Sequence, residues 1–262
     1  MRPKYPSDLT DPQWKFIKTE LPLARSGGRP RTTNIRAVVN AILYLHHAGC
    51  PWRYLPPNFP PWKTIYDYFR KWAQLGVWQK LVHGLHMYAR LKVGRSSCPH
   101  LGIVDSSSVK AYRGEEIGVD GFKKIKGRKR HILVDVLGII LDCKVSSANT
   151  PDADGGIKIL ERLNKNFKES LETILGDSQY SARFWGEAIG IYKIKVETPE
   201  KTKPGHLRAN SNLYPKRWIV ERTFAWLSNY RRLVRDYERK VIHSESMLYI
   251  AMLPILLGRL CQ

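Results

Sequence analysis

The sequence predicts an α/β protein in which a mixed five-stranded sheet with flanking helices follows a helical N-terminal region. Residues 1–95 have the apolar patterning of helices, with caps and breakers between them. From residue 101, short runs rich in Val and Ile alternate with helical segments, as in a sheet covered by helices. The stretch GRSSCPH at 94–100 is a plausible linker. We therefore expect two domains, one over 1–97 and one over 98–262.

The composition indicates an anionic partner. The 262 residues include 44 Lys and Arg against 23 Asp and Glu, which gives a net charge of +21. The excess is uneven, because residues 1–97 hold 16 basic and 4 acidic side chains and residues 98–262 hold 28 and 19. Nucleic acid is the partner that such a charge favours.

Neither the cysteines nor the apolar runs indicate an exported or membrane protein. The four cysteines form no Cys-x-x-Cys pair and are expected to be reduced thiols. The start MRPKYPSDLT has no apolar run typical of a secretory signal. The most apolar stretch, Met247 to Leu257, is shorter than the about 20 residues that span a bilayer. We expect a cytoplasmic, nucleoid-associated protein.

The N-terminal region is predicted to form three helical stretches. Thr33 or Asn34 can cap the second, and Gly49 ends it. Five prolines over 51–61 exclude a regular element there. The expected helices run from Asp11-Pro12 to near Pro22, from about 34 to Ala48, and from near Trp62 to about Leu91 with a break around Gly76.

Three strands are predicted to precede the first helix of the α/β region. LGIVDSSSV is the first, and RHILVDVLGIILDCKVSS forms two more that fold back at Leu137-Gly138. Thr150 as N-cap, followed by Pro151 and an early Asp152, predicts a helix to about Phe167. The remaining elements are a strand in LETILGDSQY, a helix over 181–192, a strand in KIKVETP, an irregular polar segment over 200–213, and helices near 215–233 and 244–260.

Three carboxylates stand in contexts that suggest a common site. Asp105 and Asp177 end predicted strands, and Glu221 lies on a predicted helix with apolar neighbours nearly all round. Burial of such a glutamate is costly without a cation. The element order is that of a ribonuclease-H-like domain, which gathers acidic residues from its first and fourth strands and a late helix. The alternatives are turn roles for the aspartates and a simple ion pair of Glu221 with Arg217, one turn earlier.

Three oxygen-donor side chains in a very basic protein indicate metal-dependent phosphoryl transfer. Hard cations such as Mg²⁺ prefer carboxylate ligands, and paired ions stabilise the attacking and leaving oxygens. We expect two Mg²⁺ ions, with Mn²⁺ as a substitute, and Asp105 as the bridging ligand. We interpret the other acids as turn or cap residues; these are Asp135, Asp142, Asp152, Asp154 and Glu197.

Four segments resemble bacterial insertion-sequence transposases of the DDE class, in particular insertion-sequence family five. They are VDSSSVK, FKKIKGRKRHILVDVLG, GDSQY and YPKRWIVERTFAWLSNYRRLVRDYE, and the similarity extends to YPSDLTDPQW and GCPWRYLPPNFPPWKTIYDYFRKW near the N-terminus. The resemblance implies a ribonuclease-H-like core with Mg²⁺ at Asp105, Asp177 and Glu221. It also implies cleavage at the ends of the element, joining of the 3′-hydroxyl ends to target DNA, and dimers or larger assemblies on paired ends.

One position departs from the signature of these transposases. Tyr214, Arg217 and Glu221 fit the expected spacing, but Ser228 stands where a lysine follows the glutamate by seven residues. Arg231 and Arg232, one turn further on, could take over its contact with the DNA backbone.

Two groups of basic residues are candidate DNA contacts. The first is the run Lys123, Lys124, Lys126, Arg128, Lys129 and Arg130, extended by Arg217, Arg231 and Arg232, which would make binding strongly salt-dependent. The second is Lys63, Arg70 and Lys71 in a helix that could enter a major groove and read terminal inverted repeats. The alternative for these N-terminal helices is a bundle packed on the core.

Three function classes follow from the sequence. The first is a transposase; the others are a non-catalytic DNA-binding regulator derived from one and a site-specific nuclease that cuts without joining. Histidine pairs at His46-His47 and His83/His86 have no cysteine at zinc-finger spacing, which argues against zinc.

Overall fold

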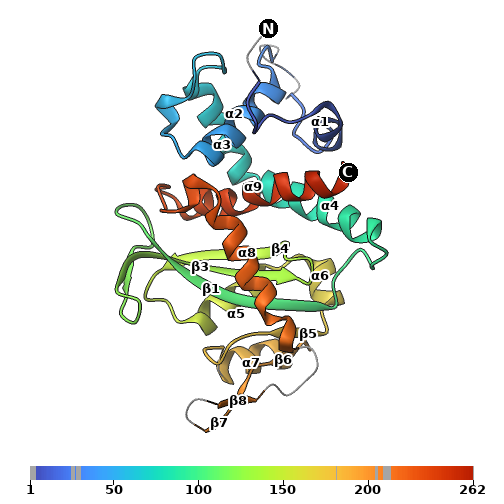
Figure 1. Cartoon of the computed structure of the whole chain (residues 1–262), viewed down its shortest axis with the longest axis vertical. Helices are drawn as coiled ribbons and strands as arrows, with labels where there is room; N and C mark the ends of the chain where they lie inside the picture. The colour runs from blue at the N-terminus through green and yellow to red at the C-terminus, as the bar shows by residue number, and fades with distance from the viewer. Residues whose placement is uncertain are drawn as a thin grey trace.

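Helices lie at one end of the molecule, and a sheet with helices on both sides lies beyond them (Figure 1). The computed structural model describes residues 4–24, 27, 31–180, 182–203, 206–208 and 214–261. The N-terminal helices are α1 (Asp11–Ile17), α2 (Ile35–Ala48), α3 (Trp62–Gln74) and α4 (Val77–Lys92), with a 3₁₀ turn, η1 (Trp52–Tyr54), among the prolines.

Local sequence signals set the ends of these helices. Thr10 and Gln13 form a capping box on α1, and the side chain of Asn34 accepts a hydrogen bond from the backbone N–H of Ala37 at the start of α2. Gly49 ends α2 with φ of 75°, and Gly76 separates α3 from α4 with φ of 64°. Both glycines adopt the left-handed conformation that other residues rarely tolerate. The predicted second and third helical stretches and the break near Gly76 are confirmed, whereas the first helix ends at Ile17, earlier than the predicted end near Pro22.

The sheet is mixed, as predicted, but has one more strand. Its strands are β1 (Leu101–Lys110), β2 (Gly118–Asp120), β3 (Ile125–Asp135), β4 (Ile140–Ser147), β5 (Thr173–Leu175) and β6 (Lys195–Glu197). The order is β2-β3-β1-β5-β6, with β4 also paired to β3. β1, β3 and β4 are antiparallel neighbours, whereas β1, β5 and β6 are parallel. β2 is too short for its pattern to be recognised. A separate hairpin of β7 (Glu200–Lys203) and β8 (His206–Arg208) occupies part of the segment predicted to be irregular.

The later helices cover both faces of the sheet. They are α5 (Asp152–Arg162), α6 (Lys165–Ser170), α7 (Ala182–Gly190), α8 (Trp218–Ser228) and α9 (Val241–Leu260), with 3₁₀ turns η2 (Tyr214–Arg217) and η3 (Arg231–Leu233). The single helix predicted to reach Phe167 is two helices, because Asn164 starts α6 by accepting a hydrogen bond from the N–H of Asn166. The N-cap of α5 is Pro151 rather than the predicted Thr150, and it makes no side-chain capping bond.

Two apolar clusters hold the layers together. One packs α5, α6 and α7 on one face of the sheet, with Phe167 and Phe184 at its centre. The other joins α2, α3 and α4 to α9 and the opposite face. α9 is long and apolar enough to cross a membrane by length and composition, but 72% of its apolar window is buried inside the protein. It is therefore the central core helix.

A buried ionic contact also ties the N-terminal helices to the sheet. Asp135, at the end of β3, accepts hydrogen bonds from Arg90 (2.5 Å) and His86 (2.9 Å) of α4. The second oxygen of Asp135 accepts from the backbone N–H groups of Leu137 and Ile139 in the following turn. The turn role expected for Asp135 is thus present, together with a link to α4. The division of the chain at residue 97 stays a prediction.

Candidate active site

The strand register places Asp105 beside Asp177. β1 and β5 are parallel, and their last paired residues are Ile103 and Leu175. Each aspartate stands two positions beyond this last β1–β5 pair, so the two lie side by side where the strands diverge. Asp105 does not end its strand as predicted, because β1 continues and pairs with β3 as far as Lys110. Side chains two residues apart on a strand share a face.

Burial and mutual repulsion act on both carboxyls. Asp105 is 19% exposed, and its Oδ1 accepts a hydrogen bond from the N–H of Ser106 at 2.7 Å. Burial, with the nearby charge of Asp177 as a further cause, raises the pKa of Asp105 to about 6. Burial also raises the pKa of Asp177, against the effect of the hydrogen bond that its carboxylate accepts from Gln179. The site therefore favours a positive charge beside these groups.

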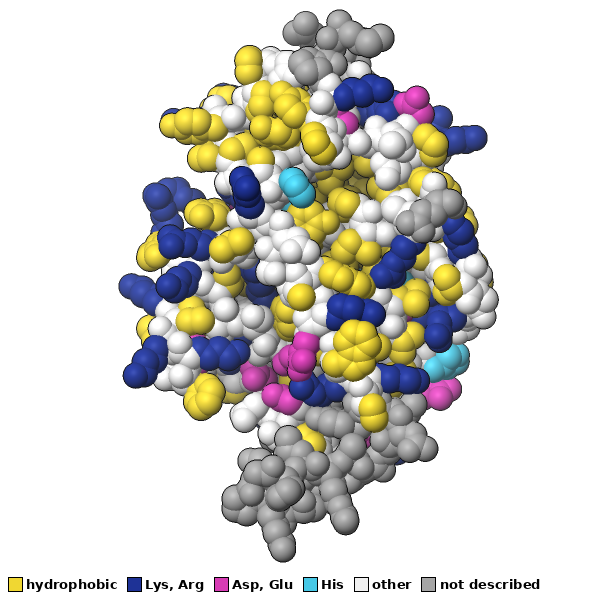
Figure 2. All heavy atoms as spheres, viewed as in Figure 1, with side chains coloured by type: hydrophobic (Ala, Val, Ile, Leu, Met, Phe, Trp, Pro, Cys, Tyr) yellow, Lys and Arg dark blue, Asp and Glu magenta, His cyan; other side chains and the backbone are white. Residues whose placement is uncertain are grey.

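Arg217 supplies a positive charge among all three predicted ligands. Its Nη2 donates to Oε1 of Glu221, one turn along α8, and its Nη1 lies 3.9 Å from Oδ2 of Asp105. Its charge also acts on Asp177, where it opposes the rise in pKa. On the face of the molecule drawn in Figure 2, acidic side chains gather near the start of α8 with Lys or Arg side chains beside them.

Glu221 lies on the exposed face of its helix, contrary to the expected apolar surroundings. Its side chain is 54% exposed. The apolar neighbours turn the other way, because Ile219, Val220 and Leu227 are buried against the sheet and core. The ion pair with Arg217, weighed as an alternative, is present.

A fourth carboxylate, Asp152, belongs to the same group. Its Oδ1 accepts a hydrogen bond from Oγ of Ser106 at 2.7 Å and lies 3.0 Å from Nζ of Lys129. Its charge contributes to the raised pKa values of Asp105 and Asp177. Our interpretation of Asp152 as a helix-start residue alone missed this contact.

The sequence held a signal for the position of Asp152. A Gly155-Gly156 pair lies inside α5, where glycine is unfavourable unless close packing requires it. A Cβ at Gly155 would lie 2.2 Å from the ring of His131 on β3, and one at Gly156 would lie 2.8 Å from Phe184. Gly155 therefore lets α5 approach β3 closely, and Gly156 lets it approach α7.

The donor chemistry fits a divalent cation. Beside the carboxylates, the hydroxyl of Tyr180 is buried and has no hydrogen-bond partner among the described residues. Burial and the charges of Asp105, Asp152 and Asp177 raise the pKa of this hydroxyl. In the present arrangement, the described residues contain no group of three acidic, His or Cys side chains close enough together to hold a metal ion. The guanidinium of Arg217 neutralises the carboxylates in this arrangement.

Part of the predicted basic surface is exposed. Lys123, Lys124 and Lys126 project from the β2–β3 hairpin, where Figure 2 shows basic side chains at one side of the molecule. Lys129 is largely covered and bonds to Asp152 and the carbonyl of Thr150. The other predicted contacts that are exposed are Lys63, Arg70, Lys71 and Arg231.

Three arginines of the predicted DNA surface are buried instead. Arg128 is fully buried; it pairs with Asp236 at 3.2 Å and donates to the carbonyls of Glu115, Glu238 and Arg239. Arg130 donates to the carbonyl of Leu233, and Arg232 binds Glu238 and the carbonyl of Cys50. The segment after η3 covers this face of β3, so these side chains hold that segment in place and are not available to DNA.

Other sequence features resolve in simpler ways. Ser228 is exposed and its hydroxyl donates to the carbonyl of Ala225. The side chain of Tyr214 lies outside the described part of the structure. The nitrogens of the core histidines bond to oxygen: His46 to the carbonyl of Met247 and His83 to that of Leu141. Burial lowers the pKa of His46 to about 3, so it is neutral.

Comparison with known proteins identifies the family. Residues 96–256 match a model described as "Transposase DDE domain", and residues 9–82 match one described as "Putative transposase of IS4/5 family (DUF4096)". The chain belongs to the DDE transposases of insertion sequences. The first match alone covers more than half of the chain. The chain is also 29% identical, over 84 residues, to the uncharacterized protein y4sN of Sinorhizobium fredii; the match covers 32% of this chain and 67% of that protein.

These matches confirm the family that the motifs indicated. The mixed sheet with flanking helices and the helical N-terminal region are consistent with the ribonuclease-H-like fold of a DDE transposase. Transposases act on DNA, and DDE domains generally use divalent metal ions.

Proposed function

We propose that this transposase cleaves the ends of its insertion sequence by metal-dependent hydrolysis and joins the resulting 3′-hydroxyl ends to target DNA. The observation that carries the proposal is the grouping of Asp105, Asp177 and Glu221 around one guanidinium at the carboxyl edge of the sheet. Two aspartates from parallel strands and a glutamate from a late helix are the arrangement that the DDE name describes.

We assign the metal ligands to Asp105, Asp177 and Glu221, with Asp152 as a further member of the group. Bound Mg²⁺ ions, or Mn²⁺ in their place, would lower the pKa of a water molecule and offset charge on the phosphate. Asp105 is the most buried of the three carboxylates and has other carboxylates near it on both sides. This position suits a ligand that two metal ions share. Ser106 and Lys129 hold Asp152 in position through its Oδ1.

DNA contacts are assigned to exposed basic residues and to the partly exposed Arg217. Lys123, Lys124 and Lys126 suit phosphate contacts beside the site, together with Arg217 and Arg231. Lys63, Arg70 and Lys71 on the exposed face of α3 suit recognition of the terminal inverted repeats by the N-terminal region. We expect a dimer or larger assembly on paired ends, in the cytoplasm and associated with the nucleoid.

The deciding experiment is an in-vitro reaction with the element's own flanking DNA and Mg²⁺. Joined product supports the transposase. Cut product without joining indicates a nuclease, and a mobility shift without cleavage indicates a DNA-binding regulator. Asp105→Asn should abolish cleavage while leaving DNA binding measurable, and full residual activity in this variant would refute the assignment.

A further inference from the structure

An alternating aromatic and basic ladder lies on α8 beside Glu221. The guanidinium of Arg222 lies between two tryptophan rings, 4.8 Å from the ring centre of Trp218 and 4.7 Å from that of Trp226. The guanidinium of Arg259, from α9, lies 5.4 Å from the same Trp226 ring. Residues four apart on a helix are neighbours, so Trp218, Arg222 and Trp226 form one stripe along the helix.

Trp218, the first side chain of this ladder, is open to solvent. Trp218 is 53% exposed, whereas Trp72 and Trp78 of the N-terminal helices are 1% exposed. The guanidinium of Arg222 packs on the indole of Trp218 in a cation–π interaction. A large exposed aromatic surface thus lies three residues from a proposed metal ligand. Figure 2 shows hydrophobic side chains beside the acidic group on this face.

The adjacent stripe of α8 carries small, exposed side chains. Beyond Arg217 and Glu221 it continues with Ala225 and Ser228, which are small and exposed. The ladder therefore stands next to a low surface that leads away from the carboxylates. The positive charge beside it comes from Arg222 and Arg259, and such a charge suits a phosphodiester backbone.

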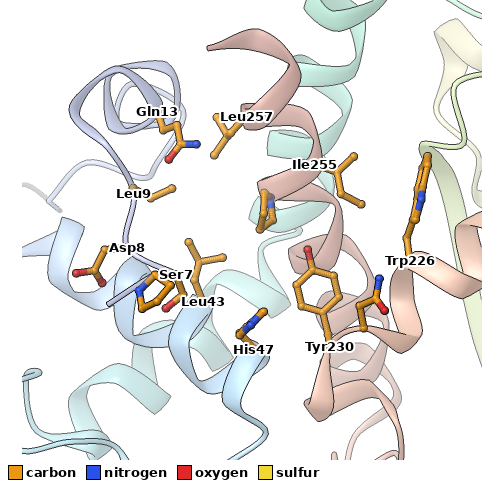
Figure 3. Close-up of a pocket in the computed structure, with 13 residues that line it drawn as sticks. Ser7, Asp8, Leu9, Gln13, Leu43, His47, Trp226, Tyr230, Ile255 and Leu257 are labelled. Carbon is orange, nitrogen blue, oxygen red and sulfur yellow. The ribbon is translucent and has the colours of Figure 1, made fainter. Parts of the chain in front are cut away.

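The ladder also leads toward the N-terminal region. Trp226 and Tyr230 line one side of a pocket, and Leu9 and Leu43 of the N-terminal part line the other side (Figure 3). α8 thus connects the carboxylates at its start with the helices at its end for which we propose recognition of the terminal repeats.

We propose that Trp218, held by Arg222, stacks an unpaired base of the DNA end and so positions the strand at the carboxylates. Aromatic side chains bind unpaired bases through their ring faces with little regard to sequence, and an adjacent arginine strengthens the contact. The occupant is one nucleotide beyond the last base pair at the cut site. This inference rests on the proposed function and adds how the strand end is held.

The test compares a blunt duplex with the same duplex carrying a three-nucleotide single-stranded 3′ extension. Binding is measured by fluorescence anisotropy with Ca²⁺ in place of Mg²⁺, and a 2-aminopurine in the extension reports stacking. We expect wild type to prefer the extended duplex by about fivefold or more. Trp218→Ala should remove the preference and the 2-aminopurine quenching, and Trp218→Phe should retain most of both.

Controls separate this inference from the function itself. Tyr88→Ala removes another exposed aromatic side chain, on α4, and should leave the preference unchanged. Equal binding of both duplexes by wild type, or an unchanged preference in Trp218→Ala, would overturn the stacking inference while cleavage could still proceed. Failure to bind either duplex, with no metal-dependent cleavage, would instead refute the proposed function.

Discussion

Arg217 should compete with metal ions for the carboxylates. At 3.9 Å between Nη1 and the Asp105 Oδ2, two unit charges attract by about 1 kcal/mol in water and by about 4 kcal/mol at an effective dielectric constant near 20. Arg217 is 26% exposed and Asp105 19%, so a value near the lower part of this range applies. The contact with the 54% exposed Glu221 adds little. A metal ion must displace this charge or bind beside it.

Replacement of the guanidinium should therefore tighten metal binding. We expect Arg217→Gln to bind Mg²⁺ or Mn²⁺ about tenfold more tightly, since about 1.4 kcal/mol corresponds to a factor of ten. The same variant without metal should be less stable, because three carboxylates then face one another without a cation. Calorimetric titration gives the first quantity, and thermal unfolding with and without metal gives the second.

Two variants make the result specific. Arg217→Lys keeps the charge and should bind metal much as wild type does. Arg70→Gln removes an equal charge from the exposed face of α3, which controls for the loss of net charge. If Arg217→Gln binds metal no more tightly than Arg70→Gln, the guanidinium does not compete for the site and the reasoning is wrong.

Three further predictions follow from the site and the buried arginines, and a fourth from the exposed lysines. Because the pKa of Asp105 is raised to about 6, the folded metal-free protein holds more protons than the unfolded chain between pH 4 and 6. Its free energy of unfolding should fall as pH rises through that window, and metal affinity should rise, as titrations from pH 5 to 8 will show; a flat profile would contradict this. Asp152→Asn should weaken metal binding in calorimetry, whereas Asp154→Asn, which alters an exposed pair with Arg183, should not; equal effects would remove Asp152 from the site. Arg128→Ala should cost about 3–5 kcal/mol of stability because it removes the ion-pair partner of the buried Asp236 and the hydrogen bonds to three carbonyls, whereas Lys126→Ala on the same strand should change stability by less than about 0.5 kcal/mol. Joint replacement of Lys123, Lys124 and Lys126 by Ala should reduce the slope of log affinity against log salt by about 2.7 if all three contact phosphates, and an unchanged slope would argue against DNA contact.

The sequence was sufficient for features set by local chemistry. Asn34, Gly49 and Gly76 mark helix ends through capping and left-handed backbone, which depend only on nearby residues. The order of strands and helices followed from short apolar runs, and it places Asp105 and Asp177 two residues beyond the same strand pair. The sequence thus indicated, by analogy with a ribonuclease-H-like domain, that the two aspartates lie close together, whereas the strand register that places them side by side came from the structure.

Features that depend on distant segments could not be predicted. Arg128 and Lys126 look alike in a basic run, but the segment after η3 covers one and leaves the other exposed. The residues next to Arg128 in the sequence do not indicate that a loop more than 100 residues later covers its side chain. Asp152 was missed for a related reason, because a helix-start role explained its local context and its contact with Ser106 spans 46 residues.

The position of α8 relative to the sheet decides whether the site can form. Thr223 donates a hydrogen bond to the carbonyl of Gly138 at 2.9 Å, in the turn between β3 and β4. Gly138 has φ of 78°, and a Cβ there would lie 2.9 Å from both Thr223 and Trp226. The same turn is held to α4 through Asp135. Glu221 and Trp218 lie on the opposite side of α8 from Thr223, so this turn, together with the packing of α8 on β1, fixes how far both stand from Asp105. The α4 helix thereby connects the N-terminal region, through Asp135 and Gly138, to the geometry of the carboxylates.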